Sequence, residues 1–299
     1  MNSSTAVRPT KVVNSPRRLG TGPYRLGVIG DPVAHSLSPA LHQPALDALG
    51  IPATYERWHT PAEQIAERVA GLRDPDVLGA NVTVPHKLAV FDLVDEISST
   101  AQRAGAVNTI VNRDGRLFGD NTDIHGFQAA MREVLGEEPP TSALVLGAGG
   151  AARAVVIALD AMGVPAISLA NRNPERAARL AAVLAPTQLN LVELTPQAIV
   201  PALQNTTLLV NATSLGWHTG ETPLALELLA ELPAQATVAD LTYRDTDLLQ
   251  AAAARGLRAV DGLGMLVHQG AQAFERFTGQ DAPVATMYAA ARAARDRRV

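Results

Sequence analysis

The sequence predicts an α/β protein of two domains, on three observations. Its 299 residues are about twice the length of a typical domain. Short apolar runs alternate with amphipathic stretches of helical period along most of the chain, and strands separated by helices pair in parallel through right-handed crossovers. A glycine-rich turn at residues 147–151 follows one apolar run directly and opens a helical stretch.

Composition excludes several classes of protein. Hydrophobic residues make up 47% and charged residues 18%, which is typical of a globular chain. The absence of cysteine excludes disulfides and thiolate chemistry. A net charge of −4 gives no sign of nucleic-acid binding, and no apolar run reaches the length of a membrane span. The seven histidines lack metal-ligand spacing. We therefore expect a cytoplasmic protein with no metal and with neither nucleic acid nor membrane as partner.

The first half predicts mixed elements. Residues 1–23 lack periodicity and predict a disordered extension. Ser38 and Pro39 suit a helix start, with Ser38 as its cap, while Pro44 should kink that helix or move its start. Asp114-Gly115 predicts a hairpin turn. The predicted elements are strand 24–29, a helix from 38, strand 53–58, helix 61–72, strand 77–84, helix 87–97, strands 106–112 and 116–118, and helix 126–135.

The second half predicts a more regular β/α alternation. The expected strands are 143–146, 166–170, 189–194, 207–211, 237–240 and 258–260. Helices at about 150–162, 174–185, 196–203, 224–231 and 245–255 lie between them. Two further helices are expected, at 265–278 and after Pro283.

The turn Gly147-Ala148-Gly149-Gly150-Ala151-Ala152 fits the dinucleotide fingerprint of a Rossmann-like domain. Gly147 permits the tight turn, Gly149 lets a pyrophosphate approach, and Ala152 lets helix and strand pack closely. Free N–H groups at the helix start would hold the phosphates. A tight turn without a ligand would look similar, but the strand and helix on either side favour a nucleotide site.

The next predicted strand ends in Asn171-Arg172, with Arg176 one helical turn further on. NAD sites place an acidic residue there to hold the ribose hydroxyls, and this chain has none. Two guanidinium groups suit a 2′-phosphate, so the pattern favours NADP over NAD. Solvation of a helix start is the alternative, and the helix dipole disfavours it.

Lys87 is one of only two lysines among the 25 basic residues, and it follows a predicted strand within Asn81-Val82-Thr83-Val84-Pro85-His86-Lys87. An amine with a lowered pKa can act as an acid or base on a hydroxyl or carbonyl group. Taken alone, Lys87 is better explained as an exposed lysine at a helix start, and His86 fits a structural role.

Further polar residues sit at the ends of predicted elements. Asp123 could face Lys87 to form a proton-transferring pair, but Thr122 or Asp123 could also simply cap a helix. Asn108 offers an amide on an apolar strand, and Ser36 and Ser38 place two hydroxyls before a helix. Gln269 is either a ligand contact or an exposed helix residue.

Taken in order, these segments resemble the shikimate dehydrogenase family from residue 24 to about 279. The motifs that carry the resemblance are Ser36-Leu37-Ser38-Pro39, Asn81 to Lys87, Gly105-Ala106-Val107-Asn108-Thr109, Asn121-Thr122-Asp123, Gly147 to Ala151, Asn171-Arg172, Asn211-Ala212-Thr213-Ser214 and Gly264-Met265-Leu266-Val267. The resemblance implies reversible reduction of 3-dehydroshikimate to shikimate with NADPH. It implies Lys87 and Asp123 as the catalytic pair.

The same resemblance implies the binding residues and the domains. Substrate would be bound by Ser36, Ser38, Thr83, Asn108, Tyr243 and Gln269. NADP would be bound by Gly147, Ala148, Gly149, Gly150, Ala151, Asn171, Arg172, Arg176, Thr213, Leu241 and Gly262. Residues 24–124 would form the substrate domain, 125–262 the Rossmann domain, and 263–299 helices that return to the substrate domain. We expect a monomer or homodimer.

Three positions depart from the family pattern, namely Pro44, Ile124-His125 and Trp217. Trp217 bears on the shape of the cleft.

The alternative functions are an NAD-preferring quinate/shikimate dehydrogenase, an inactive binding module of the same fold and a methylene-tetrahydrofolate dehydrogenase. Arg172 argues against the first, and retention of Lys87 with Asp123 argues against the second. The third leaves the motifs at residues 36–39 and 81–87 unexplained. We expect Lys87 and Asp123 to lie close together and to face the Gly147 turn.

Overall fold

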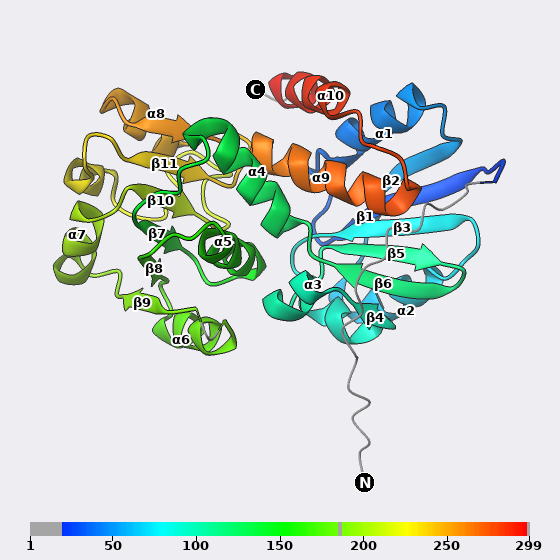
Figure 1. Cartoon of the computed structure of the whole chain (residues 1–299), viewed down its shortest axis with the longest axis horizontal. Helices are drawn as coiled ribbons and strands as arrows, with labels where there is room; N and C mark the ends of the chain where they lie inside the picture. Colours follow the sequence, from blue (N-terminus) through cyan, green and yellow to red (C-terminus); the bar gives the residue numbers. More distant parts are fainter. Residues whose placement is uncertain (1–19, 185–186, 298–299) are drawn as a thin grey trace, which may run out of the picture. The chain divides into compact units, whose positions relative to one another are not determined.

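A computed structural model describes residues 20–184 and 187–297, and it divides into two compact units (Figure 1). Unit 1 runs to Thr122 and resumes at Gln269, while unit 2 spans Asp123–His268. Residues 1–19 of the predicted extension lie outside the described range, and residues 20–23 contain no helix or strand.

Unit 1 is built on a mixed six-stranded sheet in the order β2-β1-β3-β5-β6-β4. β1 pairs in parallel with β2 and β3, and the hairpin of β5 and β6 adds antiparallel strands beside β3. Asp114 and Gly115 have φ values of 53° and 83°, as the predicted tight turn requires. The strands are β1 Tyr24–Gly30, β2 Ala53–His59, β3 Val77–Val82, β4 Glu96–Ile97, β5 Thr109–Arg113 and β6 Arg116–Asp120.

The helices of unit 1 differ from prediction in three places. Residues 61–72 form a 3₁₀ turn, η1 Ala62–Gln64, followed by α2 Ile65–Gly71. The helix predicted over residues 87–97 is wrong: η2 Ala89–Leu93 is a 3₁₀ turn and residues 96–97 are strand β4. A helix that was not predicted, α3 Ser99–Ala104, follows β4 and is capped by the side chain of Ser98.

The first helix, α1 Ser38–Ala48, begins at the predicted residue and continues through Pro44. Ser38 is not its cap, because Leu37 occupies the N-cap position. Instead, the Ser36 hydroxyl oxygen accepts a hydrogen bond from the Ser38 backbone N–H at 3.2 Å. The earlier serine therefore satisfies one of the free donors at the helix start.

Two C-terminal helices, α9 Leu263–Thr278 and α10 Val284–Asp296, provide much of the packing of unit 1 (Figure 1). A Cβ on Gly79 would lie 2.8 Å from the Phe277 ring, so β3 and α9 are in close contact. A Cβ on Gly270 would likewise meet Leu41 of α1 at 2.8 Å, and α10 packs against α1. The predicted fold class, with its C-terminal return to the first domain, is confirmed.

Unit 2 is built on a parallel six-stranded sheet in the order β12-β11-β10-β7-β8-β9. This is the Rossmann strand order, with its switch point between β7 and β10. The strands are β7 Ala143–Leu146, β8 Ile167–Ala170, β9 Leu189–Val192, β10 Leu208–Asn211, β11 Thr237–Asp240 and β12 Arg258–Val260. The helices are α4 Asp123–Leu135, α5 Gly150–Ala161, α6 Pro174–Val183, α7 Pro196–Gln204 and α8 Asp247–Ala254. The helix predicted at 224–231 is the 3₁₀ turn η3 Leu226–Glu231.

Among the described residues, no helix combines the length and apolar character needed to cross a membrane. The same part of the chain contains no group of three histidine or acidic side chains arranged to hold a metal ion.

Candidate functional site

The glycine turn of unit 2 lies at the switch point of its sheet, between β7 and α5. Gly147 has a φ of 113°, and a Cβ there would lie 2.9 Å from the carbonyl oxygen of Ala212. A Cβ on Gly149, the N-cap of α5, would meet nothing within 4 Å, while Ala152 is fully buried. The turn is therefore closed on its protein side and open above Gly149, which fits a bound pyrophosphate.

Two arginines lie exposed beyond the end of β8. Asn173 caps α6 by accepting a hydrogen bond from the Arg176 backbone N–H at 3.0 Å, so neither arginine side chain is needed for that purpose. Asn171 donates to the carbonyl oxygen of Asn173 at 2.9 Å. Within the described residues, no hydrogen bond or ion pair involves the guanidinium of Arg172 or Arg176. Both groups are open to an anionic ligand.

The buried carboxylate of Asp240, which the sequence analysis missed, organises the neighbouring strand ends. It accepts hydrogen bonds from Asn211 at 3.0 Å, from Thr246 at 2.9 Å and from the backbone N–H of Thr242 at 3.0 Å. Asn211 in turn accepts from the hydroxyl of Thr213 at 2.7 Å. In the sequence, Asp240 is visible only as an aspartate at the end of a predicted strand, which does not reveal its partners.

Other predicted residues of unit 2 lie on the loops after β10, β11 and β12. The rings of Trp217 and Tyr243 meet edge to face at 5.1 Å, and Arg244 donates to the Trp217 carbonyl at 2.6 Å. A Cβ on Gly262 would overlap the carbonyl group of Leu241, so only glycine fits there. Tyr243 is therefore held by Trp217, the position that departs from the family pattern.

Lys87 and Thr83 lie just beyond the end of β3 in unit 1. The backbone carbonyl of Lys87 accepts from the Val107 N–H at 2.8 Å, which fixes the lysine beside the segment that leads into β5. The ring Nε2 of His86 lies 2.6 Å from the carbonyl oxygen of Thr60 and is buried. This contact supports the structural interpretation of His86.

Ser36 and Ser38 are held together before α1. The Ser36 hydroxyl donates to that of Ser38 at 3.1 Å, and Ser38 is buried. The guanidinium of Arg57 donates to the Ser36 carbonyl at 2.8 Å. The Ser38 side chain also lies close to the Tyr55 hydroxyl of β2.

Asn108, Thr122 and Gln269 meet at the end of the β5–β6 hairpin. Asn108 Nδ2 donates to the Thr122 hydroxyl at 3.0 Å and lies 3.5 Å from Gln269 Oε1. All three are buried, although Gln269 follows Asn108 by 161 residues. Asp123, also buried, is the first residue of α4 and of unit 2.

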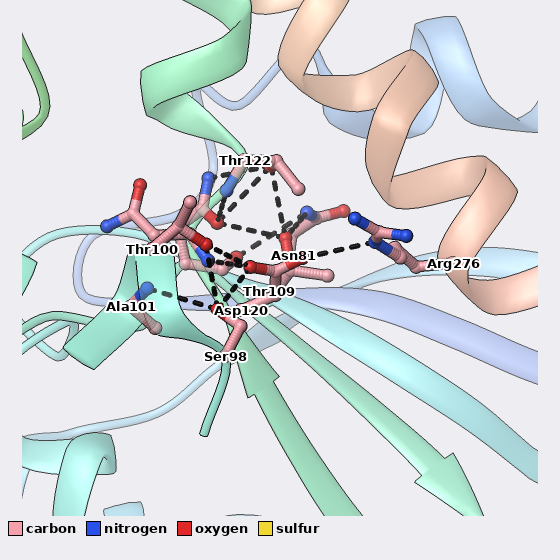
Figure 2. A network of polar contacts seen from close by, with 10 residues as sticks. Asn81, Ser98, Thr100, Ala101, Thr109, Asp120, Thr122 and Arg276 are labelled. Carbon is pink, nitrogen blue, oxygen red and sulfur yellow. Dashed lines mark hydrogen bonds and ion pairs between the residues drawn. The ribbon is translucent and has the colours of Figure 1, made fainter. Parts of the chain in front are cut away.

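Figure 2 shows a second buried carboxylate, Asp120, at the end of β6. It accepts from the hydroxyls of Ser98 and Thr100 at 2.5 and 2.7 Å, and pairs with Arg276 of α9 at 3.1 Å. Arg276 lies seven residues beyond Gln269, so the two share one side of the helix. The pair therefore ties the helix that carries Gln269 to the sheet that carries Asn108.

The comparisons with known proteins agree across the chain. Residues 28–110 match the shikimate dehydrogenase substrate binding domain, 131–218 the shikimate / quinate 5-dehydrogenase domain, and 262–292 the shikimate 5′-dehydrogenase C-terminal domain. A shikimate dehydrogenase (NADP(+)) of Symbiobacterium thermophilum is 44% identical over 285 residues, which are 93% of this chain and 97% of the relative. The chain belongs to the shikimate dehydrogenase family. It is an oxidoreductase, and the resemblance seen in the motifs is confirmed.

Solved structures of the shikimate dehydrogenase family share the fold. Shikimate 5-dehydrogenase from Thermus thermophilus, in complex with NADP(H) and shikimate, matches with a TM-score of 0.80 and 42% identity, covering 91% of this chain and 99% of that one. Quinate dehydrogenase from Corynebacterium glutamicum, in complex with NAD, matches with a TM-score of 0.81 and 32% identity, covering 89% and 98%.

The structure thus brings Ser36, Ser38, Asn108 and Gln269 into one connected part of unit 1. Thr83 and Lys87 lie on the adjoining strand end. The predicted cofactor residues and Tyr243 belong to unit 2.

Proposed function

We propose that this chain catalyses the reversible reduction of 3-dehydroshikimate to shikimate with NADPH, in the formation of aromatic amino acids. The observation that carries the proposal is the buried cluster of Asn108, Thr122 and Gln269, in a chain 44% identical to an NADP-dependent shikimate dehydrogenase. Buried amide and hydroxyl groups suit a ligand with several hydroxyl groups, because each hydroxyl can both donate and accept.

The binding roles follow from the chemistry of each group. Ser36 and Ser38 donate to the substrate carboxylate, while Thr83, Asn108, Gln269 and Tyr243 bind its ring oxygens. In unit 2 the turn at residues 147–151, with Thr213, Leu241 and Gly262, holds the dinucleotide, and Arg172 and Arg176 hold the 2′-phosphate beside Asn171. The open side of Gly149 and the exposed guanidinium groups support this assignment.

Lys87 and Asp123 form the proton-transferring pair. NADP, when bound, supplies or accepts the hydride. In the oxidative direction a neutral Lys87 amine takes the proton from the substrate hydroxyl; in the reductive direction the ammonium returns it to the forming alcohol. The Asp123 carboxylate accepts hydrogen bonds from the substrate and from the lysine, and so orients both.

The direct test measures NADPH absorbance with shikimate and NADP, and repeats the measurement with quinate and with NAD. We expect the highest kcat/KM for shikimate with NADP. Preference for quinate and NAD would favour the activity named for the Corynebacterium glutamicum neighbour. No turnover with any pair, despite NADP binding, would favour an inactive binding module.

The lysine is tested by two substitutions. Lys87→Ala should lower kcat by about 10²–10⁴-fold with a smaller change in KM, because general acid–base help is worth that much. Lys87→Arg keeps the positive charge, but a guanidinium cannot release its proton near neutral pH. Its kcat should therefore be as low as that of Lys87→Ala. Recovery in Lys87→Arg would show that only the charge matters.

The aspartate is tested by Asp123→Asn, which should lower kcat similarly and also raise KM for shikimate. Combining it with Lys87→Ala should cost much less than the product of the single effects, since the two residues act as one unit. Fully multiplicative effects would contradict the pairing.

A further inference from the structure

We propose that Thr109, Asn81 and Tyr55 are positioning residues that fix the direction of the Asn108 carboxamide, so that its N–H group faces the substrate. The inference rests on the proposed function, because it takes Asn108 as a substrate contact. It adds three residues that the motif-based assignment gave no role.

Backbone groups fix the orientation of both amides. The Thr122 N–H can only donate, and it lies 2.8 Å from one side-chain atom of Asn108, which must therefore be the oxygen. The carbonyl of Asn108 can only accept, and it lies 3.5 Å from Asn81 Nδ2. The amide nitrogen of Asn81 consequently faces β5, and its oxygen faces the other way.

The hydrogen bonds between these two ends then have one direction. Tyr55 must donate to Asn81 Oδ1, at 2.7 Å. Asn81 Nδ2 donates to the Thr109 hydroxyl at 3.2 Å, so the hydroxyl proton of Thr109 points away from Asn81 (Figure 2 labels Asn81, Thr109 and Thr122). Its nearer acceptor is Asn108 Oδ1 at 3.0 Å, and the Thr122 hydroxyl lies at 3.2 Å. Asn108 Oδ1 thus accepts from the Thr122 N–H and from the Thr109 hydroxyl, with the Thr122 hydroxyl as a third and longer donor at 3.2 Å.

The consequence lies at the other end of the Asn108 amide. Its nitrogen faces the Thr122 hydroxyl at 3.0 Å and Gln269 Oε1 at 3.5 Å. A reversed amide would place its NH₂ against the Thr122 N–H and its oxygen against that of Gln269. Asn108 therefore presents a donor on this side, and a substrate oxygen that accepts, such as a hydroxyl or carbonyl oxygen, would take the place of the longer contact with Gln269 Oε1.

Burial preserves this arrangement. Thr109 and Thr122 are fully buried, and Asn81, Tyr55 and Asn108 nearly so, so water cannot replace a lost partner. Tyr55 stacks on His42 with ring centroids 4.3 Å apart and planes 1° from parallel. Burial raises the pKa of Tyr55, so its hydroxyl keeps the proton that it donates.

The test compares Thr109→Val, which is isosteric but lacks the hydroxyl, with Thr109→Ser, which keeps the hydroxyl. Thr109→Val should raise KM for shikimate about tenfold, the effect of one lost buried hydrogen bond, while kcat changes less than about threefold and KM for NADP is unchanged. Thr109→Ser retains a hydroxyl at this position, so its KM for shikimate should stay near the wild-type value. Tyr55→Phe keeps the ring stacked on His42 but removes the hydroxyl that donates to Asn81. It should therefore also raise KM for shikimate.

Thr278→Val is the matched control. Thr278 is fully buried in the same unit, and its hydroxyl donates to the Phe274 carbonyl at 2.8 Å. We expect it to lower the melting temperature without changing KM. An equal rise of KM in the control would overturn the proposal, as would wild-type KM in both Thr109→Val and Tyr55→Phe.

Asn108→Ala separates this inference from the proposed function. If wild-type protein does not oxidise shikimate, or if Asn108→Ala leaves KM unchanged, the proposed function or its Asn108 assignment fails. If Asn108→Ala raises KM but Thr109→Val and Tyr55→Phe do not, the positioning role alone is wrong.

Discussion

His42 is fully buried in unit 1 against Tyr55, Phe274 and Phe277. Among the described residues, neither of its ring nitrogens has a hydrogen-bond partner. Burial lowers the pKa of His42 to about 3, so the ring stays neutral in the folded protein. Unfolding restores the ordinary pKa, and below pH 6.5 the unfolded chain binds one more proton than the folded chain.

The sign of this linkage predicts that His42 makes unit 1 less stable as the pH falls from 6.5 toward 3. At pH 5 the contribution should be about 2 kcal/mol relative to pH 7. In His42→Phe, which keeps an aromatic ring beside Tyr55, the free energy of unfolding should therefore fall about 2 kcal/mol less between pH 7 and pH 5. Urea unfolding followed by Trp58 fluorescence, in a Trp217→Phe background, measures the difference. An equal pH dependence in both proteins would contradict a neutral buried His42.

Under the proposed function, the preference for NADP depends on single residues at the end of β8. Arg172→Asp removes a cation and adds an acceptor for the ribose 2′-hydroxyl, and each lost charge-assisted bond is worth about 1.5–3 kcal/mol. NADP affinity should fall at least about tenfold while NAD affinity holds or improves. Arg179→Asp makes the same charge change on α6, where Arg179 pairs with Glu175 at 3.7 Å, and should leave the ratio of affinities unchanged. If Arg172→Asp also leaves that ratio unchanged, the 2′-phosphate is bound elsewhere.

At the scale of elements, the attachment of α9 to the sheet of unit 1 is open to test. Arg276→Met keeps the aliphatic part of the side chain but removes the ion pair with Asp120. Ser98 and Thr100 still bind Asp120, so the loss of stability should be about 1–3 kcal/mol. The helix carries Gln269, so KM for shikimate should also rise, with kcat less affected.

Arg73→Met provides the comparison for Arg276→Met. Arg73 pairs with Asp95 at 2.6 Å in the same unit but not on α9. Arg73→Met should lower the melting temperature without changing KM for shikimate. Equal KM in both variants would mean that the Arg276 pair stabilises the fold without positioning Gln269.

The success of sequence-based prediction varied with the type of element. β7 and β11 begin and end at the predicted residues, because buried parallel strands are short apolar runs with clear ends. Besides the missed helix α3, the errors fell at residues 62–64, 87–97 and 224–231, where the structure has 3₁₀ turns. Apolar residues at helical spacing do not distinguish a 3₁₀ turn from an α-helix, because tertiary packing decides between them.

Prediction of the site had a similar limit. The glycine turn and the arginines after β8 could be located by position alone, because a strand end in a parallel sheet defines a place. Gln269 needed the family resemblance, since nothing local brings it to a residue 161 positions earlier. Tyr55, Asn81 and Asp240 were missed because one polar residue on a strand carries no signal until its partners are known.

At the scale of the whole molecule, unit 2 is one continuous segment while unit 1 is discontinuous. A chain that ends at residue 268 keeps all of unit 2 but loses Phe274 and Phe277 from the core of unit 1. We expect this shortened chain to bind NADP with near-normal affinity and to lack activity on shikimate. Trp58 fluorescence should report an unfolded or loosened unit 1. Retained activity would contradict the proposed role of Gln269.

The discontinuity of unit 1 also sets an order of events during protein synthesis. Its sheet strands leave the ribosome first, but Phe277, which packs against Gly79, follows only after all of unit 2 has been made. At about 5–20 residues per second, the roughly 200 residues from Gly79 to Phe277 delay that contact by about 10–40 s. For this time the surface around Gly79 and Leu41 lacks its covering helices, and unit 2 can fold before unit 1 is complete. The newly made chain is therefore most exposed to aggregation in the half that was translated first.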